Sequence, residues 1–240
     1  TGDYRFLEGV VSHDSLKLSG FDGGHAFLFT AKIDNKNQIS GGKFYSGAKS
    51  TSDWYAKRNA HAPIPDGYGE TNIKAGAGKL NFSFPDVDDG HLVSITDKAY
   101  QGKVVVIQIL GSWCPNCMDE TKFLSEFYQN DHRKGVEIIG LAYERTTDFA
   151  SSQKALLPFK KRFDIQYPIL VTGVRVSDSL RTEKTLPQLK KIDAFPTTIF
   201  VDKKGNIRKV HSGFNGPATG EHYAETKKEF NETIDRLLAE

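Results

Sequence analysis

The chain has 240 residues, of which 38% are hydrophobic and 11% aromatic, and its formal net charge is +2. A chain of this length and composition can bury an ordinary core, and a charge so close to neutral argues against nucleic acid as a partner. No apolar run approaches the length needed to cross a bilayer. The chain opens at Thr1 without a leader-like segment, so we expect a signal or anchor to be absent from this sequence.

The first 47 residues predict a β-meander. Four short β-prone runs, at 6–11, 16–19, 26–33 and 39–45, are separated by turn-forming residues. Phe27, Phe29, Ala31 and Ile33 alternate along the third run, which predicts a sheet packed on one face. A meander of this size has a thin core, so we expect a remnant of a larger β domain.

The next segment, 48–80, predicts a connector, because it is rich in Gly, Ala, Lys, Asn and Pro. The sequence therefore divides into two predicted domains, 1–80 and 81–240. In the second domain strands and helices alternate, which predicts an α/β sheet covered by helices. Strands are predicted at 92–95, 104–110, 136–142, 169–171, 197–202 and 207–212, and helices at 115–129, 148–163, 186–191 and 220–238. The turn-forming run at 202–206 predicts that the last two strands are antiparallel.

Cys114 and Cys117 are the only cysteines in the chain, and two residues separate them. An apolar run at 104–110 precedes the pair and an amphipathic segment follows it, so the motif is expected at a strand-to-helix junction. Cys114 then occupies the N-cap and Pro115 the first helical position. The positive end of the helix dipole and its free N–H groups favour a thiolate at Cys114, which lowers the pKa of that thiol.

Other uses of a cysteine pair fit this sequence less well. A structural zinc site needs four ligands, but the chain has no second cysteine pair and its seven histidines are scattered. A structural disulfide between these cysteines would close a very short loop and contribute little stability. We therefore expect a redox-active dithiol, with neither a metal nor a cofactor.

Further motifs occur in a fixed order around the cysteines: Gly-Lys-Val-Val at 102–105, Gly-Ser-Trp-Cys at 111–114, Pro-Thr-Thr at 196–198 and Asp-Lys-Lys-Gly at 202–205. In this combination residues 81–240 resemble the thioredoxin-like fold, a mixed sheet flanked by helices. More narrowly, they resemble the TlpA-like branch of extracytoplasmic thiol-disulfide oxidoreductases. The resemblance implies a periplasmic or membrane-anchored protein that faces the periplasm and serves cell redox homeostasis. Residues 1–80 resemble only the β-rich domains that sometimes precede such modules.

The resemblance also implies roles for individual residues. Cys114 would be the nucleophile and Cys117 the resolving thiol, and the two would form the redox-active disulfide. Pro196 would be a cis-proline beside the cysteines and would present the backbone of Phe195 to an extended substrate. Trp113, Phe195, Pro196 and Thr197 are thus the expected substrate-binding residues.

Glu120 lies three residues after Cys117 and matches a glutamate of the TlpA-like pattern that assists proton transfer. The alternative is an acid that only favours the helix dipole, a role that Asp119 could share. Thioredoxin has a buried aspartate six positions before its first cysteine, where this chain has Gln108. An acid that serves this site must therefore be Glu120.

These observations predict an enzyme that reduces disulfides of protein or peptide substrates and is regenerated by a membrane-bound or soluble dithiol reductant. Its oligomeric state is left open. One alternative is a peroxiredoxin-type peroxidase, although Gly111 and Ile107 stand where that chemistry wants Thr or Ser and Pro. A second alternative is a binding protein that uses the aromatic residues of the N-terminal segment, with an accessory redox module.

Overall fold

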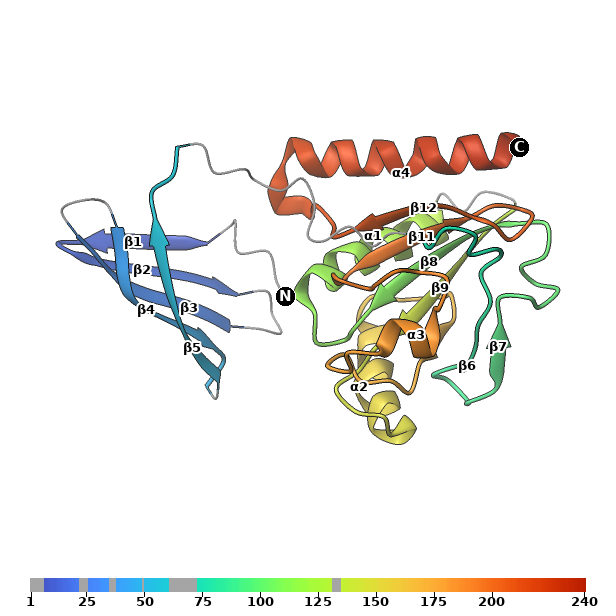
Figure 1. Ribbon diagram of the computed structural model, residues 1–240, viewed down its shortest axis with the longest axis horizontal. Coiled ribbons are helices and arrows are strands. Elements are labelled where there is room, and N and C mark those ends of the chain that lie inside the picture. The colour runs from blue at the N-terminus through green and yellow to red at the C-terminus, as the bar shows by residue number, and fades with distance from the viewer. Residues whose placement is uncertain (1–6, 22–25, 35–37, 49, 61–72, 131–134) are drawn as a thin grey trace. The chain divides into compact units, whose positions relative to one another are not determined.

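The computed structural model describes residues 7–21, 26–34, 38–48, 50–60, 73–130 and 135–240 (Figure 1). The chain forms two compact units, residues 2–66 and 67–240, which are described separately below. The domain boundary predicted after residue 80 lies further along the chain than this division. The origin of the first unit as a remnant of a larger β domain stays a prediction.

The smaller unit contains one five-stranded antiparallel sheet with its strands in chain order. Its strands are β1 (Glu8–Ser12), β2 (Ser15–Phe21), β3 (Ala26–Ile33), β4 (Gln38–Ser46) and β5 (Ser50–Lys57). On one face Phe29 stacks on Phe44, with ring centroids 4.5 Å apart, and meets Trp54 edge-on at 5.9 Å. The alternation in β3 therefore places aromatic rings on one face, as expected.

The predicted connector is wrong over Ser50–Lys57, which forms strand β5. Its first half, Ser-Thr-Ser-Asp, lacks the apolar alternation of a strand, and only pairing with β4 makes it one, for example Phe44 opposite Ser52. Strand propensity depends strongly on the neighbouring strand, which a local pattern does not contain.

The larger unit is built on a five-stranded mixed sheet in the order β10-β9-β8-β11-β12. β8 pairs in parallel with β9, and β9 with β10, whereas β11 is antiparallel to both β8 and β12. Its strands are β8 (Val104–Leu110), β9 (Val136–Ala142), β10 (Ile169–Val171), β11 (Thr197–Val201) and β12 (Ile207–Ser212). A separate hairpin joins β6 (Ser83–Pro85) to β7 (Leu92–Ser94). The predicted antiparallel arrangement of the last two strands is confirmed.

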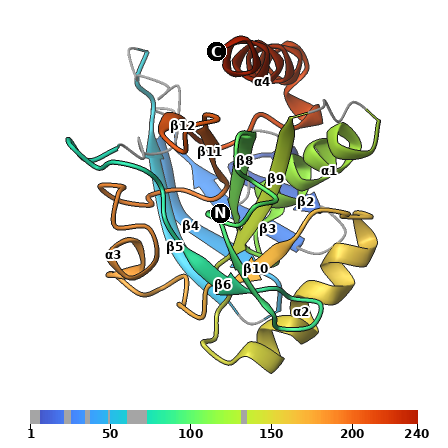
Figure 2. The same cartoon turned by 90° about the vertical axis from the view of Figure 1, so that its right-hand side faces the viewer.

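Four α-helices accompany this sheet within the described residues: α1 (Pro115–Asn130), α2 (Phe149–Arg162), α3 (Arg181–Thr185) and α4 (Glu221–Ala239). A short 3-10 turn, Pro217–Thr219, precedes α4. Phe230 of α4 meets Phe123 and Phe127 of α1 edge-on, at 5.0 and 5.1 Å, and packs on Phe200 of β11 at 5.5 Å. α1 and α4 thus share one apolar layer against the sheet, while α2 lies near β10 (Figure 2).

β8 is the central strand of the sheet, and its burial agrees with that position. All seven of its residues are buried, as expected for a strand with both faces covered. Gln108 is its one polar side chain and is completely buried. A polar group in such a place must find hydrogen-bond partners, which it does at the candidate site described below.

The prediction of a short helix at 186–191 is wrong. The structure has α3 five residues earlier, and residues 186–191 form turns. Leu186 and Leu189 are both completely buried, so their helix-like spacing reflects packing. Leu189 instead forms a β-bridge with Ile73, a contact far away in the sequence.

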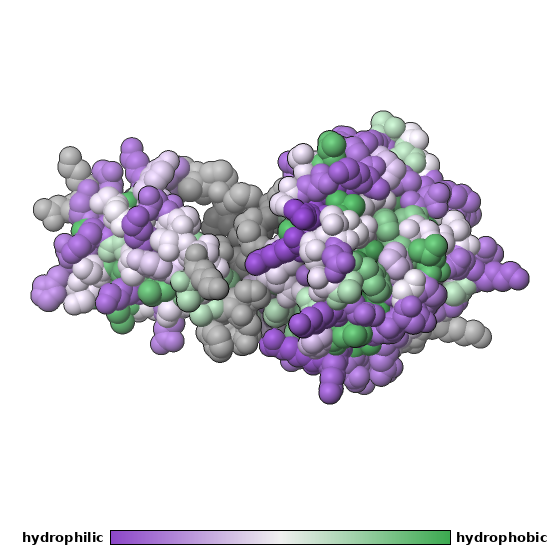
Figure 3. Space-filling view, turned by 90° about the horizontal axis from the view of Figure 1, so that it is seen from below, coloured by the Kyte–Doolittle hydropathy of each residue, from purple (hydrophilic) through white to green (hydrophobic). Residues whose placement is uncertain are grey.

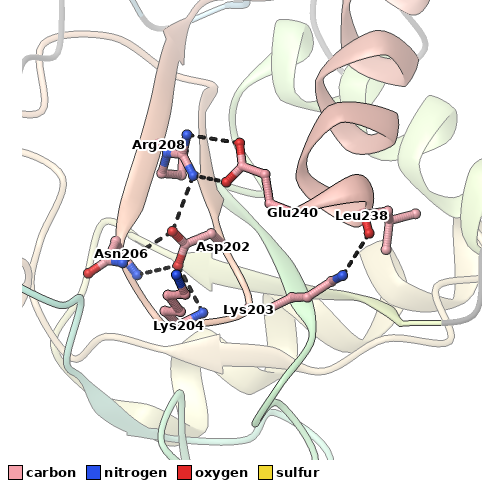
Figure 4. Close-up of polar contacts among 7 residues, drawn as sticks. All are labelled: Asp202, Lys203, Lys204, Asn206, Arg208, Leu238 and Glu240. Atoms are coloured by element: carbon pink, nitrogen blue, oxygen red, sulfur yellow. Dashed lines mark hydrogen bonds and ion pairs between the residues drawn. The ribbon is translucent and has the colours of Figure 1, made fainter.

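The turn between β11 and β12 is built around Asp202 (Figure 4). Its carboxylate accepts the backbone N–H groups of Lys204 and Asn206, both at 2.9 Å. Arg208 binds Asp202 and also the carboxylate of Glu240, just after α4. This hairpin therefore holds the end of α4 in place.

On the face shown in Figure 3, the larger unit presents apolar groups interspersed with polar side chains. Within the described ranges, none of the helices combines the length and the apolar character needed to span a bilayer.

Candidate active site

The two cysteines lie where β8 passes into α1, as predicted. α1 begins at Pro115, so Cys114 is the last residue before the helix and Cys117 lies in its first turn. The backbone N–H of Cys117 donates to Cys114 Sγ at 3.3 Å. Both thiols are free and buried.

The two thiols differ in acidity. The pKa of Cys114 is lowered, chiefly because the Cys117 thiol donates a hydrogen bond to it, with help from backbone N–H groups at the start of α1. Burial raises the pKa of Cys117 well above its usual range, and the charges of Cys114 and Glu120 add to this effect. Cys114 is therefore the thiol that ionises first, and Cys117 needs help to lose its proton.

The loop before β11 meets Cys114 directly. The Phe195–Pro196 peptide bond is cis, which confirms the prediction for Pro196. The carbonyl oxygen of Phe195 accepts a long hydrogen bond from Cys114 Sγ at 3.6 Å. Thr197 is completely buried, and its hydroxyl donates to the carbonyl of Ala194 at 2.9 Å. Thr197 thus supports this loop from within.

Trp113 packs against the same loop. Its ring lies 5.4 Å from that of Phe195, and its indole N–H donates to the Tyr143 carbonyl at 2.9 Å. A Cβ added at Gly111 would lie 2.3 Å from Trp113 Nε1, so the ring needs a glycine at this position. The guanidinium of Arg145 lies 5.8 Å from the Trp113 ring centre.

Glu120 is a buried carboxyl with two polar partners, and only 3% of its surface is exposed. Gln108 Nε2 donates to one of its oxygens at 2.8 Å and the Thr198 hydroxyl to the other at 2.5 Å. Burial raises the pKa of Glu120 to about 7, although these two hydrogen bonds oppose the shift. Glu120 also lies beyond the first turn of α1, where the helix dipole has little influence.

A second buried carboxyl supports the cysteine loop. Glu144, 6% exposed, accepts the backbone N–H of Ser112 at 2.8 Å and the Ser112 hydroxyl at 2.9 Å. Glu144 follows closely after β9, at the same edge of the sheet as the end of β8. Glu144 is not among the site residues predicted from the sequence, although its position just after a predicted strand is a signal that could have identified it.

The segment after β10 contributes to the site through Arg181. Its guanidinium lies 5.9 Å from the Phe195 ring centre and donates to the carbonyl of Val176 at 3.2 Å. Tyr143, whose ring meets Phe195 edge-on at 5.7 Å, shares a hydrogen bond of 2.6 Å with Thr185 of α3. Across the part of the chain that is described, no cluster of three or more His, Cys, Asp or Glu residues could hold a metal ion.

Comparison with known proteins decides the family. The Redoxin family model matches residues 74–227, which is more than half of the chain. This chain belongs to the Redoxin family. The match includes both cysteines, Glu120 and the cis-proline loop, and leaves the whole of the smaller unit outside the Redoxin region.

Two relatives of this Redoxin protein are named "Thiol-disulfide oxidoreductase ResA". The one from Bacillus thuringiensis subsp. konkukian is 28% identical over 138 residues, covering 58% of this chain and 69% of the relative. The one from Bacillus subtilis is 24% identical over 145 residues, covering 60% and 71%. A solved thiol-disulfide isomerase from Corynebacterium glutamicum shares the fold, with a TM-score of 0.51 and 21% identity over 70% of this chain and 99% of its own.

These findings confirm the thioredoxin-like fold, the TlpA-like resemblance and the prediction of a thiol-disulfide oxidoreductase for this Redoxin protein. Neither the peroxidase nor the binding-protein alternative gains support from them.

Proposed function

We propose that this protein reduces disulfide bonds in protein or peptide substrates, with Cys114 as the nucleophile. The observation that carries the proposal is the contrast between the two thiols: Cys114 Sγ accepts the Cys117 N–H at the start of α1, whereas Cys117 lies deeper beside Glu120. This contrast gives each cysteine one task in thiol-disulfide exchange. The TlpA-like resemblance supports the reductive direction.

The reaction has two exchange steps. The Cys114 thiolate attacks one sulfur of the substrate disulfide, forming a mixed disulfide and releasing the other sulfur as a thiolate that takes a proton from solvent. Cys117 then transfers its proton to Glu120 and attacks Cys114 Sγ, which releases the second substrate sulfur. Two electrons pass to the substrate, and the enzyme is left with a Cys114–Cys117 disulfide. A dithiol reductant must supply two electrons to restore it.

Glu120 is the proton acceptor in this scheme. A general base works best when its pKa is near the working pH, and burial raises the pKa of Glu120 to about 7. Glu120 lies one helical turn after Cys117, on the same face of α1. Since the pKa of Cys117 is raised, a nearby base of matched strength is what its deprotonation requires.

The proposed substrate-binding residues are Trp113, Phe195, Pro196 and Thr197. The Phe195 carbonyl beside Cys114 supports docking of an extended peptide through its backbone. Because Thr197 is completely buried, its part in binding is to support the loop. Cys114 itself is completely buried, so attack requires the residues around it to move and expose the sulfur.

The proposal includes a cellular location for the protein. We place the protein outside the cytoplasm, periplasmic or membrane-anchored and facing the periplasm, where it serves cell redox homeostasis. There a membrane-bound or soluble dithiol reductant regenerates it. The TlpA-like resemblance supports this placement.

A trapping experiment tests the mechanism. The Cys117→Ser variant should accumulate mixed disulfides between Cys114 and substrate proteins in an extract of the native source, and Cys114→Ser, the matched control, should accumulate none. Absence of trapped species with both variants would contradict the mechanism. The direction is tested by the reduction potential, followed through Trp113 fluorescence in thiol buffers. A value near roughly −270 mV supports a reductase, whereas one near roughly −120 mV indicates a disulfide-forming oxidant.

A further inference from the structure

A row of polar side chains crosses the sheet of the larger unit. Thr198 of β11 is paired in register with Gln108 of β8 on one side and with His211 of β12 on the other. Residues paired in this way point to the same face of a sheet. Glu120 of α1 bonds to the first two members of the row. The row therefore leads from the buried carboxyl to β12, an edge strand.

A cavity lies along the part of this row that is nearest to β12. Glu120, Thr198 and His211 line it, together with Phe230 and the ion pair between Lys209 and Glu229. Its volume is about 20 Å³. A cavity of that size with polar groups on its wall has room for one water molecule. Thr198 and His211 are cross-strand neighbours, so such a water would lie within reach of both.

The two partners of Glu120 differ in what they can do with a proton. Gln108 donates through its amide nitrogen, and its oxygen already accepts from Thr121 at 3.2 Å. An amide of this kind holds the carboxylate but carries no proton onward. The Thr198 hydroxyl can donate and accept at once, so the side of Glu120 that faces Thr198 is the side from which a proton can leave.

His211 is suited to pass a proton from the cavity to solvent. It is half-buried, and within the described ranges no hydrogen bond engages its ring nitrogens. Three ionisable groups face it: Glu229 from α4, Lys209 from β12 and Glu120 from α1. Burial lowers the pKa of His211, with Lys209 acting in the same direction and Glu229 against it. The ring is thus neutral at neutral pH, ready to accept a proton on one nitrogen and release one from the other.

We propose that His211 accepts the proton that leaves Glu120 and releases it to solvent. The proton passes from Glu120 through Thr198 and one cavity water to His211, so His211 acts through Glu120, as a positioning residue. The inference rests on the role of Glu120 in the proposed function. The proton is the one that Cys117 gives up when it attacks the mixed disulfide. Loss of this proton returns Glu120 to the ionised form, and along the route only O–H and N–H bonds are broken and formed, one for one.

The test is a single turnover of the reduced protein with oxidised glutathione, followed by Trp113 fluorescence across a pH series. His211→Ala should slow formation of the Cys114–Cys117 disulfide about tenfold near neutral pH. This is less than the roughly hundredfold or more that loss of a general base itself costs, because His211 acts only through Glu120. Because the substitution opens space beside the cavity, added imidazole should restore the rate. His222→Ala is the matched control, since His222 is an exposed histidine of α4, and should react like the wild type with or without imidazole.

The double variant completes the test. In a Glu120→Gln protein, His211→Ala should cause no further loss, because both act on one proton. An unchanged rate and pH profile in His211→Ala, a loss that imidazole does not restore, or a further tenfold loss in the double variant would each overturn the inference. Oxidised glutathione needs only the dithiol, so these results stand whether or not protein substrates are reduced. Insulin reduction by the wild type reports separately on the proposed function.

Discussion

Replacing Glu120 with glutamine measures what the fold loses by holding an ionised carboxylate in its core. Glutamine has the same shape as the protonated acid and can keep a hydrogen bond to Gln108 and one to Thr198. Burial raises the pKa of Glu120 from its ordinary 4.5 to about 7. One pKa unit corresponds to about 1.4 kcal/mol, so the ionised carboxylate costs the folded state about 3 kcal/mol.

The sign of the pH dependence follows from proton binding. Below pH 4.5 the carboxyl is protonated in both the folded and the unfolded chain, and there is no penalty. Between pH 4.5 and about 7 the folded chain holds the proton more tightly, so this group makes stability fall as the pH rises. Glu120→Gln should therefore match the wild type at the acidic end and exceed its unfolding free energy by about 3 kcal/mol at mildly alkaline pH.

Urea unfolding of the reduced protein, followed by far-ultraviolet circular dichroism, is the measurement. All described helices belong to the larger unit, so the helical signal reports on it. Glu126→Gln is the control, because Glu126 is exposed on the same helix, and it should change the free energy by less than about 0.5 kcal/mol at every pH. A Glu120→Gln effect that stays constant with pH, or that grows toward acid, would refute the reasoning.

Three further predictions concern the loop that carries the cysteines. Gly111→Ala should cost about 1 to 3 kcal/mol of unfolding free energy and shift Trp113 fluorescence, because the new Cβ would lie 2.3 Å from the indole nitrogen. Cys117→Ala should raise the pKa of Cys114, measured by the pH dependence of its alkylation, because the main hydrogen bond that lowers this pKa is removed. Glu144→Gln should lower the free energy of unfolding in urea by about 1 to 3 kcal/mol, because one of the two donors of Ser112 then faces an amide NH₂ group.

Each of these three predictions has an outcome that would contradict it. Gly111→Ala with wild-type stability and emission would mean that the Trp113 ring moves aside at no cost. An unchanged or lower pKa of Cys114 in Cys117→Ala would mean that the helix start alone determines its acidity. Wild-type stability of Glu144→Gln would mean that the Ser112 hydroxyl rotates to accept from the new amide NH₂ group.

The cysteine site was predictable because its determinants are local. A seven-residue apolar run, two cysteines and a proline at the first helical position are contiguous in the sequence, and together they specify a strand, a thiol at a helix start and the helix itself. The cis bond at Pro196 was predicted by the resemblance of its Pro-Thr-Thr motif and is confirmed.

Elements that depend on distant partners were harder to predict. β5 is a strand because β4 lies beside it. α3 precedes a turn with two completely buried leucines, one of which, Leu189, forms a β-bridge with Ile73. In both places the local pattern is weak or misleading, and packing between segments decides the structure.

The sequence by itself determined which two thiols are available, that Cys114 lies at a helix start, and which acid is near them. The tertiary structure alone decided how that acid behaves. The pKa of Glu120 is raised because the carboxyl is buried between the sheet and the layer that α1 and α4 share, and the hydrogen bonds from Gln108 and Thr198 only partly offset this effect. Burial and strand register arise only when segments far apart in the chain come together, so neither the environment of Glu120 nor the alignment of Thr198 with His211 could be seen in the sequence.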